Sequence, residues 1–201
     1  KSSGKAKIYR LDWTESQPLD VDLGTLDYRL IQEDGLTYVS LRSLVSGTYD
    51  NMLARYAREG AKARGSKAVI YDLRGNVGGS DSWPRKWIQS FLGTQNSIET
   101  SMLYAQKNSA LFAAENSESL LPEDEGTCFA REVHGTWYEN DIPIIVLVDD
   151  HCGSSGEGAV QLLKTLDNVL IVGSNTAGYQ LCGNISTFTL PYTCLLYTSD
   201  A

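Results

Sequence analysis

Short apolar runs separated by amphipathic stretches give the first indication of how this chain folds. Residues 67–73 (KAVIYDL), 142–148 (IPIIVLV) and 169–172 (VLIV) are compact apolar runs, typical of strands buried on both faces of a parallel sheet. Helical patterns over residues 50–64 and 155–166 precede the first run and follow the second. Because helices alternate with buried strands, the pattern predicts an α/β layered fold.

A strand signal also precedes this alternating region. Residues 27–32 and 36–41 are predicted to pair as a hairpin, because Asp34 and Gly35 between them form a strong turn signal. Farther upstream, residues 5–11 (KAKIYRL) alternate charged and apolar side chains like a strand. The first 25 residues are therefore interpreted as linker strands or as the tail of an upstream domain.

Helical patterns and one polar stretch complete the outline. Asp50 is expected to cap the helix over residues 50–64, whose apolar side chains recur on one face. Residues 81–92 also have a helical pattern, since Pro84 is tolerated in a first turn. The polar and acidic residues 108–127 are interpreted as an insertion or a lid.

Composition narrows the possible partners. The chain has 201 residues, of which 42% are apolar, enough for one domain with a sizeable core and part of a second. Its net charge of −8 argues against nucleic acid or an anionic membrane surface as partner, because either would repel it. No stretch approaches the roughly 20 apolar residues of a membrane helix. The sequence thus favours a globular protein with neither of those partners.

The cysteines and the end of the chain indicate no cofactor chemistry. Four cysteines are too few and too irregularly spaced for a disulfide scaffold, and no C-x-x-C pair indicates zinc. They are Cys128, Cys152, Cys182 and Cys194. Residues 194–201 (CLLYTSDA) match the translation of a transposon-end adapter used in sequencing libraries, so the natural sequence is expected to stop near Thr193. The alternative interpretation is a short strand with a polar tail.

Two loops that follow buried strands carry candidate chemistry, because ligands gather at the carboxyl ends of parallel strands. In the first, residues 72–80 (DLRGNVGGS), three glycines can expose N–H groups that point at a developing negative charge. The alternative is a tight strand-to-helix turn in which Arg74 forms a nearby salt bridge.

The second loop, residues 148–158 (VDDHCGSSGEG), places Ser154 on a turn and the N–H of Ser155 at the start of a helix. An oxyanion held against Ser154 would meet this donor and the positive end of the helix dipole, as an acyl-transfer nucleophile requires. The same residues can form a capping box, in which Ser154 caps the helix and Glu157 reaches back. Spacing alone leaves both interpretations open.

Taken together, three segments resemble the tail-specific (C-terminal processing) serine proteases. Residues 69–80 (VIYDLRGNVGGS) resemble the family's hydrophobic-D-L-R-x-N-x-G-G element, and residues 142–157 (IPIIVLVDDHCGSSGE) resemble its strand and nucleophile element. Residues 171–178 (IVGSNTAG) are similar to its V-G-x-x-T-x-G loop. The segments occur in family order, and the resemblance covers roughly residues 27–193.

The resemblance implies an α/β fold with a ClpP/crotonase-like core, in which βα units build a spiral sheet. Residues 26–193 would form this peptidase core, incomplete at both ends, and the residues before it could end a PDZ domain. By position, Ser154 matches the nucleophile, and N–H groups of Ser155 and of Gly78 or Gly79 match the oxyanion hole. The family implies hydrolysis through an acyl-enzyme, no cofactor, an extended or C-terminal polypeptide segment as partner, and a location in the cell envelope or outside the cell.

One position departs from the family pattern. Where Ser-Lys members have their lysine base, directly after T-x-G, this chain has Tyr179, and an ordinary tyrosine is a poor base at neutral pH. The chain is therefore more similar to the branch of the tricorn core and the interphotoreceptor retinoid-binding protein. His151, His134 and Lys164 are considered as bases, and none is assigned.

Other chemistry fits the sequence less well. Residues 115–125 lack the ligand spacing of a calcium loop, and Asp149 and Asp150 are expected to point to opposite faces of a strand end. Trp83 and Trp87 are expected in the core or a groove wall. The leading hypothesis is a serine endopeptidase. The alternatives are an inactive binding module on the same fold and a crotonase-type acyl-CoA enzyme.

Overall fold

The computed structural model describes residues 28–47, 49–107, 126–180, 186–189 and 196–199. The strand predicted for residues 5–11 and most of the lid predicted for residues 108–127 lie outside these ranges. Within them, no helix is long and apolar enough to cross a membrane.

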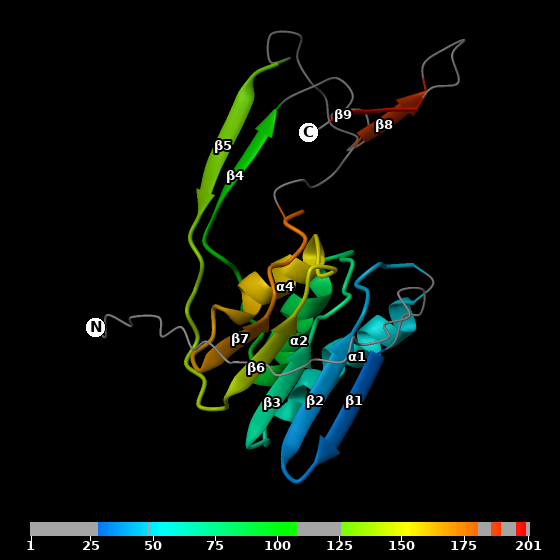
Figure 1. Cartoon of the computed structure of the whole chain (residues 1–201). Helices are drawn as coiled ribbons and strands as arrows, with labels where there is room; N and C mark the ends of the chain where they lie inside the picture. The colour runs from blue at the N-terminus through cyan, green and yellow to red at the C-terminus, as the bar shows by residue number, and fades with distance from the viewer. Residues whose placement is uncertain (1–27, 48, 108–125, 181–185, 190–195, 200–201) are drawn as a thin grey trace.

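A five-stranded mixed sheet forms the centre of the molecule (Figure 1). Its strands lie in the order β1-β2-β3-β6-β7, with β2, β3, β6 and β7 parallel and β1 antiparallel to β2. The strands are β1 Tyr28–Glu33, β2 Leu36–Leu41, β3 Ala68–Asp72, β6 Ile144–Val148 and β7 Val169–Gly173. The α/β class and the strands predicted from apolar runs are confirmed. Their expected burial on both faces is wrong for β7, where Leu170 and Ile171 are exposed because the described helices cover only one face of the sheet.

The β1–β2 hairpin turns where the sequence predicts it. Asp34 and Gly35 both have positive φ, 52° and 81°, as a two-residue type I′ turn requires. The turn places Glu33 opposite Leu36 and fixes the register of the whole pair. It also makes β1 an edge strand beside the parallel part of the sheet.

Three helices pack together on one face of the sheet (Figure 1). They are α1 Asp50–Ala63, α2 Ser82–Leu92 and α4 Ser155–Leu163. The sequence predicts all three, although α4 ends at Leu163 rather than at 166, because the next turns are closed by i→i+3 hydrogen bonds.

The predicted cap of α1 is wrong. Tyr49 occupies the N-cap position, and Asp50 is already the first helical residue. The Asp50 carboxylate accepts the N–H of Gly47 at 2.9 Å instead, so it closes the turn before the helix. A carboxylate at this position still interacts favourably with the helix dipole.

Aromatic side chains fill the core between helices and sheet. The Trp87 ring is fully buried, stacks on Phe91 with ring centroids 5.3 Å apart, and meets Tyr71 edge-on at 4.9 Å. Tyr56 of α1 hydrogen-bonds to the Tyr71 hydroxyl. Such aromatic pairs stabilise a fold by about 0.5–1.5 kcal/mol beyond their burial, so they hold α1 and α2 against the sheet. Trp87 is therefore a core residue, as expected.

The sequence analysis misses two small antiparallel sheets. β4 Met102–Lys107 pairs with β5 Cys128–Val133, and β8 Ser186–Thr189 pairs with β9 Leu196–Ser199. Neither pair is joined by the two-residue turn that makes a hairpin recognisable in a sequence. β9 lies within the residues suspected to derive from an adapter, and their origin stays a prediction.

Candidate active site

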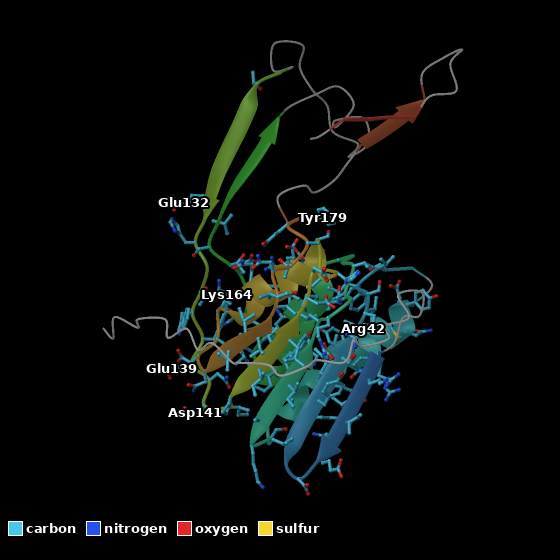
Figure 2. All side chains as sticks on the ribbon, viewed as in Figure 1. Arg42, Glu132, Glu139, Asp141, Lys164 and Tyr179 are labelled. Atoms are coloured by element: carbon cyan, nitrogen blue, oxygen red, sulfur yellow. The ribbon has the colours of Figure 1, made fainter. Side chains whose placement is uncertain are left out.

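Three loops lie side by side at the carboxyl ends of the parallel strands. The glycine loop (residues 73–81) follows β3, the serine loop (residues 149–154) follows β6, and the Thr176 loop (residues 174–180) follows β7. Figure 2 shows Tyr179 at this edge of the sheet and Glu139 at the opposite edge. The carboxyl edge is where open α/β sheets bind ligands.

Backbone hydrogen bonds join the three loops. The N–H of Gly153 donates to the carbonyl of Asn76, which links the serine loop to the glycine loop at 2.9 Å. The N–H of Ala177 donates to the carbonyl of Cys152, which links the Thr176 loop to the serine loop at 2.9 Å. The three sequence segments that resemble the protease family therefore lie together in the structure, joined by hydrogen bonds.

Ser154 has an unusual backbone conformation for the residue that begins a helix. Its φ is 52° and its ψ is −125°, whereas an ordinary capping serine lies in the β region. The predicted capping box is present, and the Glu157 carboxylate accepts the N–H of Ser154 at 3.1 Å. A non-glycine residue in such a sparsely populated conformation costs about 1–3 kcal/mol, and such residues cluster at functional sites. Capping alone does not account for that strain.

Glu157 does more than close the capping box. Its side chain is buried, with 6% of the residue exposed, and it accepts two further hydrogen bonds. They come from the Thr176 hydroxyl at 2.6 Å and from the N–H of Gly178 at 2.9 Å. One carboxylate thus holds the Ser154 backbone and the Thr176 loop together, a role that the sequence analysis misses.

Gly78 packs directly against Ser154. A Cβ added at Gly78 would lie 2.7 Å from the Ser154 Cβ and 2.9 Å from the Ser155 nitrogen, closer than real side chains allow. The φ of Gly78 is 97°, which also favours glycine. The glycine loop can therefore reach the nucleophile position only because this residue has no side chain.

Two backbone donors at this junction have no partner among the described residues. They are the N–H groups of Ser155 and Gly79. The N–H of Gly78, by contrast, donates to Asn76 Oδ1 at 2.9 Å. The structure thus brings together Ser154, Ser155, Gly78 and Gly79, and the geometry favours Gly79 over Gly78 as the available donor.

Asn76 holds the glycine junction, the contact of Gly78 and Gly79 with Ser154 and Ser155, in place through its hydrogen bonds. It is fully buried, and its Nδ2 donates to the carbonyl of Leu41 at the end of β2, at 2.8 Å. Its Oδ1 accepts the N–H of Gly78, and its carbonyl accepts the N–H of Gly153. The sequence analysis assigns Asn76 no role, although a polar residue between Arg74 and the glycines is a signal for such anchoring.

A buried ion-pair cluster supports the start of the glycine loop. Asp72 accepts hydrogen bonds from Arg74 Nη2 at 2.8 Å and from the Tyr38 hydroxyl at 2.7 Å, and Arg42 lies 3.4 Å away. Burial by itself would raise the pKa of Asp72, but these partners outweigh it and lower the pKa from 3.8 to about 2. The Arg74 salt bridge of the alternative interpretation is present, and it coexists with the contact between Gly78 and Ser154.

No candidate base forms a hydrogen bond with Ser154 in the described part of the chain. His151 Nδ1 lies 2.9 Å from Asp150 Oδ1, with both side chains exposed, and no hydrogen bond joins His151 to Ser154. His134 and Lys164 are exposed residues with no contact to the serine. Tyr179 lies against the serine loop, but its hydroxyl makes no hydrogen bond with a described residue.

The predicted separation of Asp149 and Asp150 is wrong. β6 ends at Val148, so strand alternation no longer applies, and the carboxylates gather with His151 within 4.8 Å of one another. Asp149 Oδ1 already accepts the N–H of Gly75 at 2.8 Å, which fixes the turn against the glycine loop. The calcium alternative for residues 115–125 falls outside the described residues.

A sequence profile of peptidase family S41 matches residues 35–198, which contain all three loops. The chain belongs to peptidase family S41. The family expected from the three segments is thus confirmed, and a peptidase fits both the fold and the arrangement of the loops. No curated protein matches the chain.

Solved structures share the fold at low sequence identity. A candidate peptidase from Parabacteroides merdae is 23% identical, with a TM-score of 0.50, over 84% of this chain and 50% of its own. Mature CPAF is 14% identical, with a TM-score of 0.52, over 85% and 44%. The photosystem II D1 C-terminal processing protease is 17% identical, with a TM-score of 0.45, over 79% and 34%. The chain spans about half or less of the length of these three structures.

Proposed function

We propose that this S41 peptidase is a serine endopeptidase whose nucleophile is Ser154. The observation that carries the proposal is the strained Ser154 at the start of α4, packed on Gly78, with two N–H donors beside it that have no acceptor among the described residues. A strained residue held next to free donors at a helix N-terminus suits a nucleophile whose product is an oxyanion.

In the proposed reaction, Ser154 Oγ attacks the carbonyl carbon of a peptide bond and gives its proton to a base. The carbonyl oxygen becomes an oxyanion, which the N–H groups of Ser155 and Gly79 stabilise together with the dipole of α4. The C–N bond then breaks, and the amine leaves with a proton. Water adds to the acyl-enzyme, releases a carboxylic acid and restores the hydroxyl.

A polypeptide in extended conformation is the substrate that this site fits best. Residues 42–45 and 77–80 run parallel, joined by Leu44 N–H to Gly78 O at 2.8 Å and Ser80 N–H to Leu44 O at 2.9 Å. The N–H of Gly79 has no acceptor among the described residues, so the scissile carbonyl of an added strand is the acceptor that it suits. Strand addition needs only backbone groups, so it suits the ends of varied polypeptides.

One observation favours a second candidate function, an inactive peptide-binding module on the same fold. Tyr179 stands where the Ser-Lys relatives have a base, and no described base contacts Ser154. In that case Ser154 serves as a helix cap, and the glycine junction binds a chain without cutting it. The S41 family match supports a peptidase in general, and it removes the reason for a crotonase-type enzyme.

Labelling with a fluorophosphonate probe separates the two candidates. The protein is expressed from its full gene as wild type, as Ser154→Ala and as Ser97→Ala, which removes an exposed serine outside the three loops. We expect labelling of wild type and Ser97→Ala and none of Ser154→Ala. A folded wild type that resists the probe would favour the binding module. Labelling that persists in Ser154→Ala would place the nucleophile elsewhere.

A further inference from the structure

A large aromatic side chain lies exposed beside the proposed nucleophile. Tyr179 belongs to the Thr176 loop, and 62% of its surface is accessible. Its ring lies on Gly153, the residue before Ser154: a Cβ at Gly153 would be 3.1 Å from Tyr179 Cδ2 and 3.9 Å from Cε2. The reactive serine and this ring are therefore close neighbours.

The backbone that leads to this ring is held in place by hydrogen bonds. Thr176 and Gly178 both donate to the buried Glu157 carboxylate, and Ala177 donates to the carbonyl of Cys152. Three hydrogen bonds within the residues just before Tyr179 leave its backbone little freedom. A ring on a fixed backbone has less conformational freedom to lose on binding than a ring on a mobile loop, so it suits a contact surface.

The lack of a side chain at Gly153 fits this contact. Gly153 does not have a positive φ, so its backbone conformation does not require glycine. The requirement for glycine is steric, because a Cβ would crowd both the Tyr179 ring and the Ala177 Cβ, the latter at 3.3 Å. Gly153 therefore lets the ring lie close to the serine.

A second exposed apolar side chain lies on the glycine-loop side of Ser154. Val77 precedes Gly78, which touches Ser154, and 55% of Val77 is accessible. Apolar side chains from two different loops thus flank the nucleophile, and both are uncovered. Exposed apolar surface beside a site commonly marks where a ligand binds.

We propose that Tyr179 is a specificity-determining residue, whose ring contacts the substrate side chain next to the scissile bond and favours a large apolar or planar one. This inference rests on the proposed peptidase function. It gives Tyr179 a role that needs neither its hydroxyl nor a proton transfer, because only the face of the ring is used. Stacking and apolar contact with one ring are worth about a three- to tenfold preference.

The test uses quenched fluorescent peptides that are identical except for Ala, Leu or Phe on either side of the scissile bond. The measured quantity is the ratio of kcat/KM for the Phe peptide to that for the Ala peptide. We expect Tyr179→Ala to lower this ratio about three- to tenfold and Tyr179→Phe to leave it unchanged. Gly153→Ala displaces the ring without removing it, and it should lower the ratio as well.

Two controls separate this inference from the function on which it rests. Trp137→Ala removes another exposed aromatic side chain, whose Nε1 donates to Asp167 away from the site, and it should leave the ratio unchanged. The fluorophosphonate labelling rate should stay within about threefold of wild type in Tyr179→Ala, because a small probe does not need the ring. Wild type that fails to label overturns the peptidase itself.

Two other results would overturn the proposed role of Tyr179 and leave the proposed peptidase function intact. If Tyr179→Ala labels normally and keeps the wild-type ratio, the ring does not contact the deciding side chain. If Tyr179→Phe loses labelling, the hydroxyl takes part in the chemistry, and the ring is not acting merely as a contact surface.

Discussion

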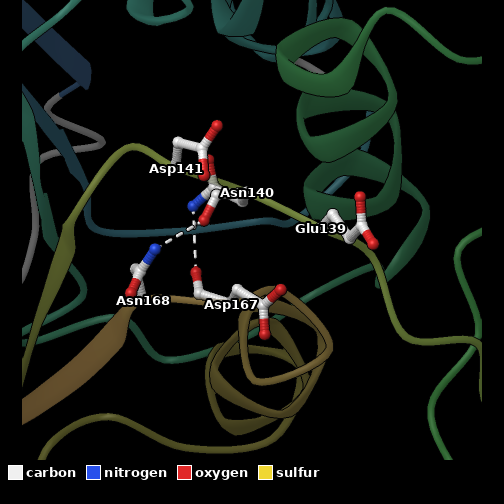
Figure 3. Close-up of a pocket in the computed structure, with 5 residues that line it drawn as sticks. All are labelled: Glu139, Asn140, Asp141, Asp167 and Asn168. Atoms are coloured by element: carbon white, nitrogen blue, oxygen red, sulfur yellow. Dashed lines mark hydrogen bonds between the residues drawn. The ribbon is translucent and has the colours of Figure 1, made fainter.

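Polar residues lie at both ends of the parallel strands, here called the two edges of the central sheet, and they make different contacts at each. At the edge where β6 and β7 begin, polar side chains line a depression of about 590 Å³ (Figure 3). They belong to Glu139, Asn140, Asp141, Asp167 and Asn168. Asn140 Nδ2 donates to the carbonyls of Ile142 and Asp167, at 2.7 and 2.9 Å. Asn168 Nδ2 donates to the carbonyl of Asn140 at 2.7 Å, so the amides join the two chain segments that enter β6 and β7.

At the Ser154 edge, buried polar groups join the loops of three strands instead. Asn76 links β2, the glycine loop and the serine loop, and Glu157 links the serine loop to the Thr176 loop. Among the described residues, the N–H groups of Ser155 and Gly79 stay without a partner. A polar depression alone therefore does not identify a site. Backbone donors without a described partner beside a strained residue are the stronger indication.

The largest effect is expected from removing the carboxylate at the centre of the Ser154 edge. Glu157→Ala leaves three donors without their acceptor, and the free energy of unfolding should fall by about 3 kcal/mol. Displacement of Ser154 by about 1 Å should also slow fluorophosphonate labelling about 100-fold. Urea unfolding and labelling rates measure the two effects. Labelling at the wild-type rate would show that the Thr176 loop does not position the serine.

A pair of asparagine variants tests the two edges directly. Asn76→Ala and Asn140→Ala each remove a buried amide and orphan its partners, so each should lower the free energy of unfolding by about 2 kcal/mol. Only Asn76→Ala should slow labelling, because only Asn76 holds the glycine junction. Equal losses of labelling in the two folded variants would contradict the difference between the edges.

A matched pair of glycine variants separates backbone strain from contact with Ser154. Gly78 and Gly47 have similar φ values, 97° and 113°, so alanine is strained at both and should cost about 1 kcal/mol or more. A Cβ at Gly47 meets nothing within 4 Å, whereas one at Gly78 meets the Ser154 Cβ. Gly78→Ala should therefore slow labelling at least about tenfold, while Gly47→Ala should not. Labelling rates at a temperature where both variants are folded measure the difference.

The sequence predicts the parts of this site that are close together along the chain. The strand-loop-helix pattern singles out the serine loop, and the glycine-rich turn after a strand singles out the glycine loop. The roles expected for Ser154, Ser155 and Gly78 or Gly79 come from the family resemblance, and they stay predictions. Long-range contacts are not visible in such patterns: Glu157 meets Thr176 across 19 positions, and Asn76 meets the carbonyl of Leu41 across 35. Rules based on neighbouring residues, such as helix capping, also fail where another contact competes for the same side chain.

The same division between local features and long-range contacts applies to the fold. Three apolar runs and a strong turn signal predict the central sheet, because short apolar runs between helical patterns leave few other interpretations. β4 and β5 lack both signals, so their pairing is not predictable from the pattern. Asp50 illustrates the second limit: its carboxylate satisfies either a helix end or the turn before it, and the structure selects the turn.

The smallest expected effect is acid sensitivity that originates at the Ser154 edge. Because the folded pKa of Asp72 is about 2, against an ordinary 3.8 in the unfolded chain, the ion pair contributes its full stability at pH 5 and loses this contribution as the pH falls toward 2. Between pH 5 and pH 3 the loss should be about 1 kcal/mol. Urea unfolding across this range should therefore show a decline that is weaker in Asp72→Asn, which starts less stable. Asp141→Asn, an exposed carboxylate at the opposite edge, should keep the wild-type decline. An unchanged slope in Asp72→Asn would assign the acid sensitivity to other groups.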